Sequence, residues 1–397
     1  MIINRTFLSL TTLFLFLSNI SFAEEEILAE TSEIESKNSK KKLINGRFIT
    51  ELYDENGYHS NDDNNKFNSE YTKSYLDLNF NITDNLYVKS LTALEPTNVA
   101  IQNIPDRTNR HFKNESLFTR ELSLNYQASN FSVGLGKINN LNFGKYWDNQ
   151  NKIWATNLVK TSYRQIEKIG FKGDYAIGDE KKNGRYIFGF SIFTNDSKYT
   201  DNSLINDRSS TLKSNATPGD TRNLNSYIAS LDINYDFDNE EKLSYHFAYM
   251  NLAVNGRQSS VTPAKISDQK AIALNMNYQY PISENILINP IIEYVTMSNV
   301  GGNIDHKTNM LTTNIDVFLY KNWNVGISHV IRADLIQAEN GLDTSITEFS
   351  FGYRFPKSSI LSGLQLLAGY KKDIIDNKSN PIKTDSVGAM ARYVKDF

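Results

Sequence analysis

From Leu43 onward, segment after segment of this chain alternates apolar and polar side chains. In residues 227–237 (YIASLDINYDF), tyrosine, alanine, leucine, isoleucine and phenylalanine occupy one face, and serine, aspartate and asparagine occupy the other. Residues 271–280 and 347–355 repeat the pattern. Successive side chains of a β-strand point to opposite faces, so each segment predicts a strand with one apolar and one polar face.

The alternation recurs in about sixteen segments, which predict an all-β fold. One segment contains Pro290 on its apolar face, where a local bulge is expected because proline has no N–H to donate. The predicted strands cover residues 44–54, 69–81, 86–95, 116–127, 131–138, 167–176, 185–195, 225–237, 243–253, 270–280, 286–297, 309–320, 323–334, 345–355, 362–373 and 384–397.

The connections between these strands are alternately short and long. The short ones carry turn residues, as in TDN at 83–85 and KN at 321–322. Short turns at one end and long loops at the other are typical of outer-membrane barrels, in which the short turns are periplasmic. Both chain ends fall on the short-turn side, as an even number of strands requires, so the count of sixteen is self-consistent. The long connections are expected near residues 55–68, 96–115, 139–166, 196–224, 254–269, 298–308, 335–344 and 374–383.

Aromatic residues gather where the apolar faces meet the short turns. Such rings suit the headgroup level of a membrane, whereas a soluble β-sandwich would show no preference for one end. The alternation also explains the polar mean hydropathy of -0.46. We therefore predict a closed antiparallel transmembrane β-barrel in the bacterial outer membrane, surrounded by lipid and lipopolysaccharide. The aromatic residues in question are Phe80, Tyr126, Phe131, Tyr235, Phe237, Tyr278, Tyr280, Trp323, Tyr353 and Phe355.

The first 42 residues differ in composition from the rest. Residues 1–23 are predicted to be a secretory signal peptide, with Arg5 before an apolar run and a small-residue cleavage site ending at Ala23. Residues 24–42 form an acidic and then basic segment. It is expected to be either a disordered periplasmic leader or a short helical or coiled-coil stub. The barrel would occupy residues 43–397.

The connection at residues 139–166 contains Trp147 and Trp154, two of the three tryptophans. A Gly-Lys pair at 136–137, Phe-Gly at 143–144, Trp-Asp at 147–148 and Ile-Gly-Phe at 169–171 accompany it. In these motifs the chain resembles the bacterial outer-membrane porins of the general and phosphate-selective type. The resemblance implies a water-filled channel for passive diffusion of small polar solutes or ions, a homotrimer, and a third loop that narrows the pore. An external lid or a trimer-contact loop is the alternative.

The last strand, which ends at Phe397, resembles the terminal strand that the barrel-assembly machinery recognises. Lys395 departs from that pattern, since an apolar or aromatic residue is usual there. Phe397 is accordingly predicted to be the assembly signal.

Basic side chains dominate the third long loop, and fixed positive charge in a narrow pore favours anion entry. The predicted constriction consists of Lys145, Trp147, Asp148, Lys152, Trp154, Lys160 and Arg164. The strand alternation also places basic residues on the pore wall, namely Arg47, Lys73, Lys168, Lys172, Arg332, Arg354 and Arg392. Wall acids are Glu51, Asp77, Glu121, Asp232, Asp236, Glu293, Asp316 and Glu348. Mixed ladders of this kind predict a weak anion preference.

Nothing in the sequence predicts an enzyme, a metal site or a cofactor. The chain has no cysteine, and its five histidines lack metal-ligand spacing. A net charge of -3 disfavours a nucleic-acid partner. Loop aromatics could stack on sugars, although packing against the wall is the commoner role. The main alternative to a channel is a closed barrel that serves as a surface adhesin or structural protein.

Overall fold

A computed structural model describes residues 42–96, 109–195, 203–206, 218–221, 223–237, 240–254, 266–336, 343–376 and 380–397. The expected signal peptide and nearly all of the expected leader lie outside the described residues, as do parts of five of the long loops. The signal peptide and the leader remain predictions.

Sixteen long strands form the wall, and each lies within a few residues of its predicted range. A further strand of two residues, β4 (Arg110–His111), pairs in parallel with the beginning of β2, at Ser69 and Glu70. The wall strands are β1 (Ile44–Ser60), β2 (Phe67–Asn81), β3 (Leu86–Pro96), β5 (Glu115–Gln127), β6 (Phe131–Ile138), β7 (Lys168–Asp179), β8 (Gly184–Asn195), β9 (Ser226–Asp236), β10 (Lys242–Leu252), β11 (Gln269–Ser283), β12 (Ile286–Ser298), β13 (His306–Leu319), β14 (Trp323–Ile336), β15 (Asp343–Arg354), β16 (Leu364–Asp376) and β17 (Ile382–Asp396).

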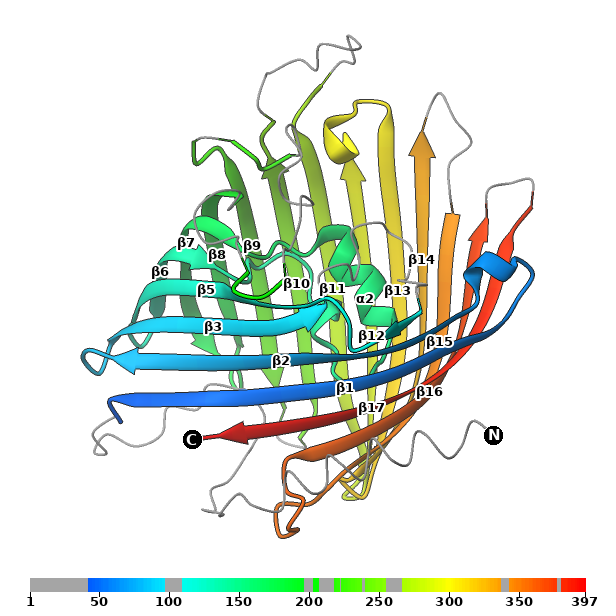
Figure 1. The fold of residues 1–397 in the computed structure, drawn as a ribbon. Coiled ribbons are helices and arrows are strands. Elements are labelled where there is room, and N and C mark those ends of the chain that lie inside the picture. The colour runs from blue at the N-terminus through cyan, green and yellow to red at the C-terminus, as the bar shows by residue number, and fades with distance from the viewer. Residues whose placement is uncertain are drawn as a thin grey trace.

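Antiparallel pairing between the first and last strands closes the barrel. Each wall strand pairs with its neighbour in the chain, and β17 pairs with β1 from Arg47 opposite Asp396 onward. Gly46 and Phe397 exchange two backbone hydrogen bonds of 3.1 and 3.0 Å across this seam. In Figure 1, β1 to β3 cross steeply in front of β10 to β14, because the strands of a barrel tilt about its axis. The predicted closed all-β barrel is confirmed.

The two faces of the wall carry different side chains. Large apolar residues such as Leu274 and Phe349 are exposed on the outside, whereas polar residues such as Glu293 and Ser350 are buried inside. A closed sheet satisfies every wall strand's backbone without water, and an apolar outer face suits hydrocarbon. The chain is therefore a membrane-spanning barrel of the outer-membrane type.

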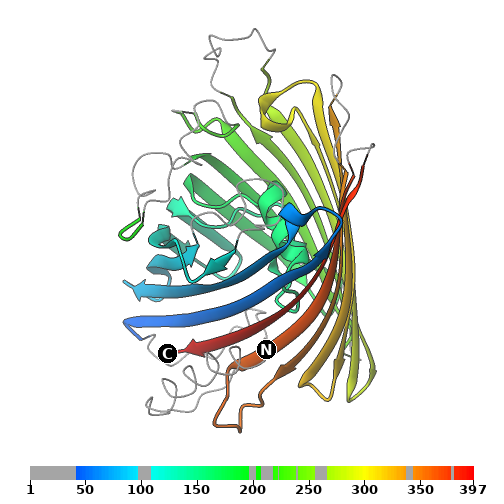
Figure 2. The ribbon, with the colours of Figure 1, turned by 45° about the vertical axis from the view of Figure 1, so that its right-hand side comes forward.

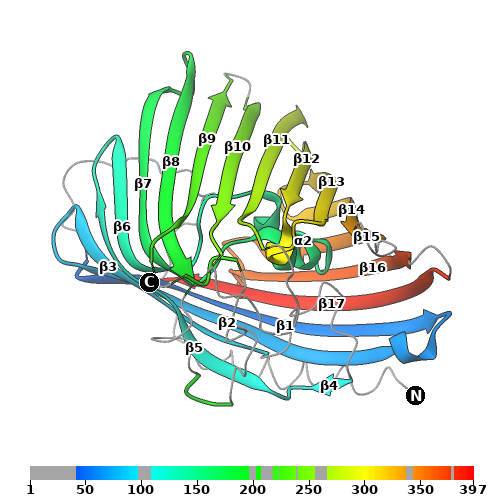
Figure 3. The ribbon, with the colours of Figure 1, turned by 90° about the horizontal axis from the view of Figure 1, so that it is seen from above.

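A helix lies inside the barrel, which the strand alternation does not predict (Figures 2 and 3). It is α2 (Ala155–Tyr163), and a short 3-10 turn, η2 (Tyr146–Asp148), precedes it in the same loop. Two more 3-10 turns, η1 (Asp63–Asn65) and η3 (Val300–Gly302), lie in long loops.

Among the residues that the structure describes, no helix is both long and apolar enough to cross a membrane.

The bulge expected at Pro290 does not occur. Pro290 pairs opposite Ile315 without any shift in register. On the β11 side, two pairs drop out of the ladder between Asn277–Ile291 and Tyr280–Ile288, and the register continues unchanged. The expectation was wrong because a missing N–H removes a ladder bond without inserting a residue.

Replacing Leu274, at mid-strand on the outer face of β11, with arginine should lower the free energy of unfolding by about 2–4 kcal/mol, since the charge would face hydrocarbon. Urea titration of the protein folded into lipid vesicles measures this. Asn277→Arg on the inner face of the same strand is the control and should cost about 1 kcal/mol or less. Equal losses in the two variants would contradict the assignment of faces.

Candidate functional site

The connection between β6 and β7, residues 139–167, lies inside the barrel and is called the inner loop below (Figures 2 and 3). Two glycines with positive φ shape its entry, Gly136 at 132° and Gly144 at 72°. A Cβ on Gly144 would lie 2.4 Å from the Tyr163 ring, so the loop folds on itself where only glycine fits. Because it lies inside the barrel (Figures 2 and 3), the inner loop is not an external lid.

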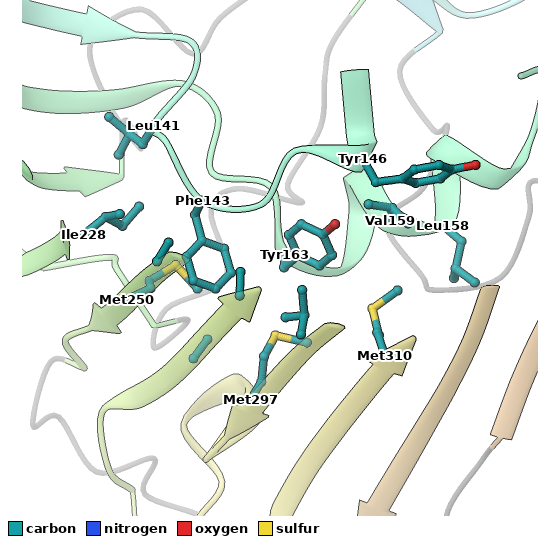
Figure 4. Close-up of a cluster of buried hydrophobic side chains, with 14 of the residues drawn as sticks. Leu141, Phe143, Tyr146, Leu158, Val159, Tyr163, Ile228, Met250, Met297 and Met310 are labelled. Atoms are coloured by element: carbon teal, nitrogen blue, oxygen red, sulfur yellow. The ribbon is translucent and has the colours of Figure 1, made fainter. Parts of the chain in front are cut away.

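The apolar side chains of the inner loop pack on the inner wall. Figure 4 shows Phe143 beside Met250, and Tyr163 above Met297 and Met310. These side chains belong to one buried cluster that joins the loop to strands β8 to β15. Burial of this apolar area draws the loop onto the wall. The loop aromatics Tyr146, Trp154 and Tyr163 are buried, as wall packing predicts.

Glu348 of β15 accepts three backbone hydrogen bonds at the start of α2. The donors are the N–H groups of Ile153, Trp154 and Ala155, at 2.6, 3.0 and 2.6 Å. The first N–H groups of a helix have no partner within it, and Trp154 at the N-cap offers no capping side chain. A carboxylate from the wall thus caps this helix, and its negative charge interacts favourably with the positive end of the helix dipole.

Glu293 of β12 holds the loop around η2 in the same manner. It accepts from the backbone N–H groups of Lys145 (2.6 Å) and Tyr146 (3.1 Å). The Tyr163 hydroxyl donates to its other carboxylate oxygen. One buried wall carboxylate therefore ties both ends of the central part of the loop together.

Two further acids, which the sequence places only among the mixed wall charges, bind loop cations. Asp316 of β13 pairs with Lys152 at 2.6 Å, and both side chains are fully buried. Asp232 of β9 pairs with Lys145 at 3.0 Å and also contacts His246 at 2.8 Å. These pairs neutralise two of the four cations expected to set the charge of the constriction.

A row of small residues on the inner wall accommodates the loop. Gly326, Ser350, Gly369 and Gly388 pair in turn across β14 to β17. A Cβ on Gly326 would lie 2.0 Å from the Lys152 amine, and one on Gly388 would lie 2.5 Å from the Trp154 ring. The small residues of this row therefore leave room for Lys152 and Trp154 of the loop.

A second row, nearer the short-turn end, is mostly basic. Cross-strand pairing places Arg354, Gln365, Arg392, Glu51 and Lys73 in one line across β15 to β2. Arg392 approaches Glu51 at 3.4 Å and donates to Gln150 of the inner loop. The Lys73 amine lies 4.6 Å from the centre of the Tyr53 ring. Arg354 is exposed at the end of its strand.

The remaining predicted pore residues are more dispersed. Arg332 pairs with Asp334 at 2.9 Å and reaches Ser162 of the loop at 3.3 Å. Other contacts join Arg47 to Asp396 (2.5 Å), Glu121 to Lys89 (3.7 Å), Arg164 to the Trp147 ring (4.1 Å) and Lys371 to the Trp154 ring (5.3 Å). The side chains of Asp148 and Lys160 are outside the described part of the structure.

Among the described residues, no group of three or more histidine, cysteine, aspartate or glutamate side chains has the arrangement of a metal site.

Glu348→Ala would leave three buried N–H groups without an acceptor, at about 1–3 kcal/mol each. We expect the free energy of unfolding in vesicles to fall by about 3 kcal/mol or more. The control is Asp77→Ala, which removes an inner acid whose partner is Lys89 and whose side chain is part exposed. Its expected loss is about 1 kcal/mol or less. Matching losses would show that Glu348 does not hold the loop.

Gly388→Ala should push the Trp154 ring away from the wall, because the new methyl group overlaps it. In a background with Trp147→Phe and Trp323→Phe, Trp154 is the remaining tryptophan, and its fluorescence should shift to the red and become more accessible to acrylamide. Gly173→Ala is the matched control, since its nearest neighbouring atom would be 3.5 Å away. An unchanged Trp154 spectrum in the Gly388 variant would refute the contact.

No family model matches the chain, and no curated protein sequence matches it. Solved structures do resemble it. Outer-membrane expressed OmpT of Vibrio cholerae is 11% identical, with a TM-score of 0.50 over 89% of this chain and 97% of that one. The outer membrane channel DcaP of Acinetobacter baumannii is 10% identical (TM-score 0.49, 89% and 96%), and OpdK of Pseudomonas aeruginosa, solved with vanillate, is 10% identical (0.46, 89% and 99%). The likeness to the Vibrio protein is one of fold alone, that of a closed outer-membrane β-barrel.

Proposed function

We propose that this barrel is a porin, a water-filled channel through which small polar solutes or ions diffuse passively, and that the inner loop forms its constriction. A loop that crossed the centre of the barrel would seal it. Here the polar groups and apolar side chains of the loop are directed at the wall from β8 to β17. This arrangement favours a narrowed channel over a plug.

The observation that carries the proposal is a difference in exposure between two parts of the inner wall. Beneath the loop, the Lys152 and Asp316 side chains are 0% exposed. On β1 to β3, the inward-facing Arg47, Asp77 and Lys89 side chains remain 35%, 30% and 32% exposed. Ionisable groups that stay exposed inside a closed barrel border water, so this side of the lumen is where a solute would pass.

We further propose a weak anion preference that rests on the wall. The loop cations Lys145 and Lys152 are paired with acids, so they add little net charge to the pore. The row from Arg354 to Lys73 contains three cations and one carboxylate, and it borders the exposed side of the lumen. A positive row along a pore raises the local anion concentration.

The other expected properties also remain proposals. The family resemblance supports assembly as a homotrimer, and a trimer form is known for OmpT of Vibrio cholerae. Phe397 exchanges two backbone hydrogen bonds with Gly46 of β1, and it is proposed to be the signal that the barrel-assembly machinery recognises. The protein is proposed to act as a channel and not as an enzyme, with outer-membrane lipid and lipopolysaccharide around it and no cofactor.

Purified protein in a planar bilayer should produce stepwise current, and the zero-current potential across a salt gradient should show modest anion selectivity. A protein that folds as a barrel but gives no current steps would favour the closed adhesin or structural barrel. Cation selectivity would overturn the proposed anion preference but not the proposed channel.

Arg354→Glu should reduce or reverse the anion selectivity, because it changes the charge of the most exposed cation in the basic row. Lys270→Glu is the matched control, an exposed lysine on the outer face of β11 that should leave the zero-current potential unchanged. Equal shifts in the two variants would show that selectivity arises from overall charge and not from this row.

A further inference from the structure

The outer face of the wall contains a pocket on strands β11 to β14. Its volume is about 410 Å³, which falls within the range of about 300–1,000 Å³ that is usual for small-molecule sites. Most of its lining side chains point outward, away from the lumen, and the four largest apolar ones are exposed. The apolar side chains on this outward face are Met276, Pro290, Ile292, Ile315 and Ile327.

Two short side chains in neighbouring rows open the pocket. Pro290 of β12 is opposite Ile315 of β13, and two ladder pairs are missing on the other side of this proline. In the next row, Thr313 of β13 lies between Ile292 and His329. Longer side chains on the flanking strands form the sides of the pocket. It is therefore part of the folded wall and does not depend on the loops.

The pocket lies at the depth of the hydrocarbon. Trp323 marks the periplasmic end of β14, and His329 is six residues further along the same strand. A tilted strand crosses the hydrocarbon in about 9–11 residues, so His329 lies near the middle. Water is scarce at this depth, and an occupant of the pocket must come from the membrane.

His329 gives this apolar pocket one polar group. Its Nδ1 lies 2.8 Å from the hydroxyl of Thr347. Its Nε2 forms no hydrogen bond or ion pair with any residue that the structure describes, and the side chain is part exposed in the pocket lining. A polar nitrogen in hydrocarbon is stabilised by a hydrogen-bond partner, and the wall supplies none.

The chemistry of the partner follows from the two possible roles of this imidazole. The Thr347 hydroxyl can donate to Nδ1 or accept from it, so Nε2 is correspondingly a donor or an acceptor. A hydroxyl group can serve in both cases. A plain hydrocarbon chain would fill the pocket but leave Nε2 without a partner, and a charged group would be expelled from this depth.

We infer that this pocket binds a lipid-soluble molecule that has an aliphatic chain and a hydroxyl group. The chain packs against Pro290, Ile315 and Ile327, and the hydroxyl group bonds to Nε2 of His329. A free aliphatic alcohol and a membrane lipid with a hydroxylated chain share this chemistry. The site lies on the outer face, goes beyond the proposed channel and requires no solute in the lumen.

A photoreactive alcohol tests the site. Dodecanol that carries a diazirine is added to the protein folded in vesicles, and mass spectrometry identifies the cross-linked peptides. We expect saturable labelling concentrated on β12 to β14. Unlabelled dodecanol should displace the probe at about tenfold lower concentration than dodecane, because the alcohol forms one more hydrogen bond. His329→Leu should remove this difference and leave labelling saturable.

Ile315→Trp should fill the pocket and abolish the concentrated labelling. Ile272→Trp on the outer face of β11 is the matched control, since Ile272 is 45% exposed against 47% for Ile315 and does not line the pocket. Resistance to heating in detergent confirms that each variant folds. Even labelling around the barrel, equal loss in the two tryptophan variants, or equal displacement by alcohol and alkane would overturn the inference. Protection of the pocket by a second protein chain would also overturn it.

Native mass spectrometry of protein extracted from its own membranes distinguishes the two sources of the ligand. The retained mass is that of a free alcohol in one case and of a complete lipid with a hydroxylated chain in the other. A retained molecule without a hydroxyl group would contradict the assignment. Neither measurement requires current, so failure of the channel proposal is detected separately in the planar bilayer.

Discussion

The structure depends first on the backbone pairing between β1 and β17. In hydrocarbon, an open sheet edge would leave a full row of N–H and C=O groups without hydrogen-bond partners. Each of these groups would cost several kilocalories per mole. Pairing from Arg47–Asp396 to Ser60–Thr384 removes that edge. The two ends of the chain must therefore meet before any part of the wall is stable in the membrane. The alternation of side chains then divides the molecule into an outer apolar surface and an inner polar one.

Inside that wall, carboxylates hold the inner loop mainly through its backbone. Glu348 and Glu293 together accept five backbone N–H groups from the loop. Bonds to main-chain groups fix the position of the loop whatever its side chains are, and apolar packing adds the driving force. Two cations of the loop, Lys145 and Lys152, pair with two other wall acids, Asp232 and Asp316. The inward-facing ionisable side chains Arg47, Asp77 and Lys89, on β1 to β3, stay partly exposed instead.

The strands could be predicted from the sequence because each records its environment locally: one residue faces lipid and the next faces the lumen. The lengths of the turns and loops also predicted which end of the barrel faces the periplasm. The fastening of the inner loop could not be predicted in this way. Asp232 and Asp316 belong to the same polar pattern as many other wall residues, and only the tertiary fold determines which reach Lys145 and Lys152. The glycines at 326, 369 and 388 were a usable signal, since three side-chain-free positions fall on inward-facing sites of β14, β16 and β17. Helix α2 was missed because nine residues are too few for a clear helical period.

The separation in sequence between the inner loop and the carboxylates that hold it has a consequence for assembly. Lys145 is 148 residues from Glu293, and Ala155 is 193 residues from Glu348. Contacts of such long range form only after the intervening chain has been arranged, and loop-closure entropy makes them slow. The inner loop therefore docks late, after β12 to β15 have paired. Until then the nascent barrel has a wider and wetter interior than the mature one, and in the proposed channel this late docking is the event that sets the width of the pore.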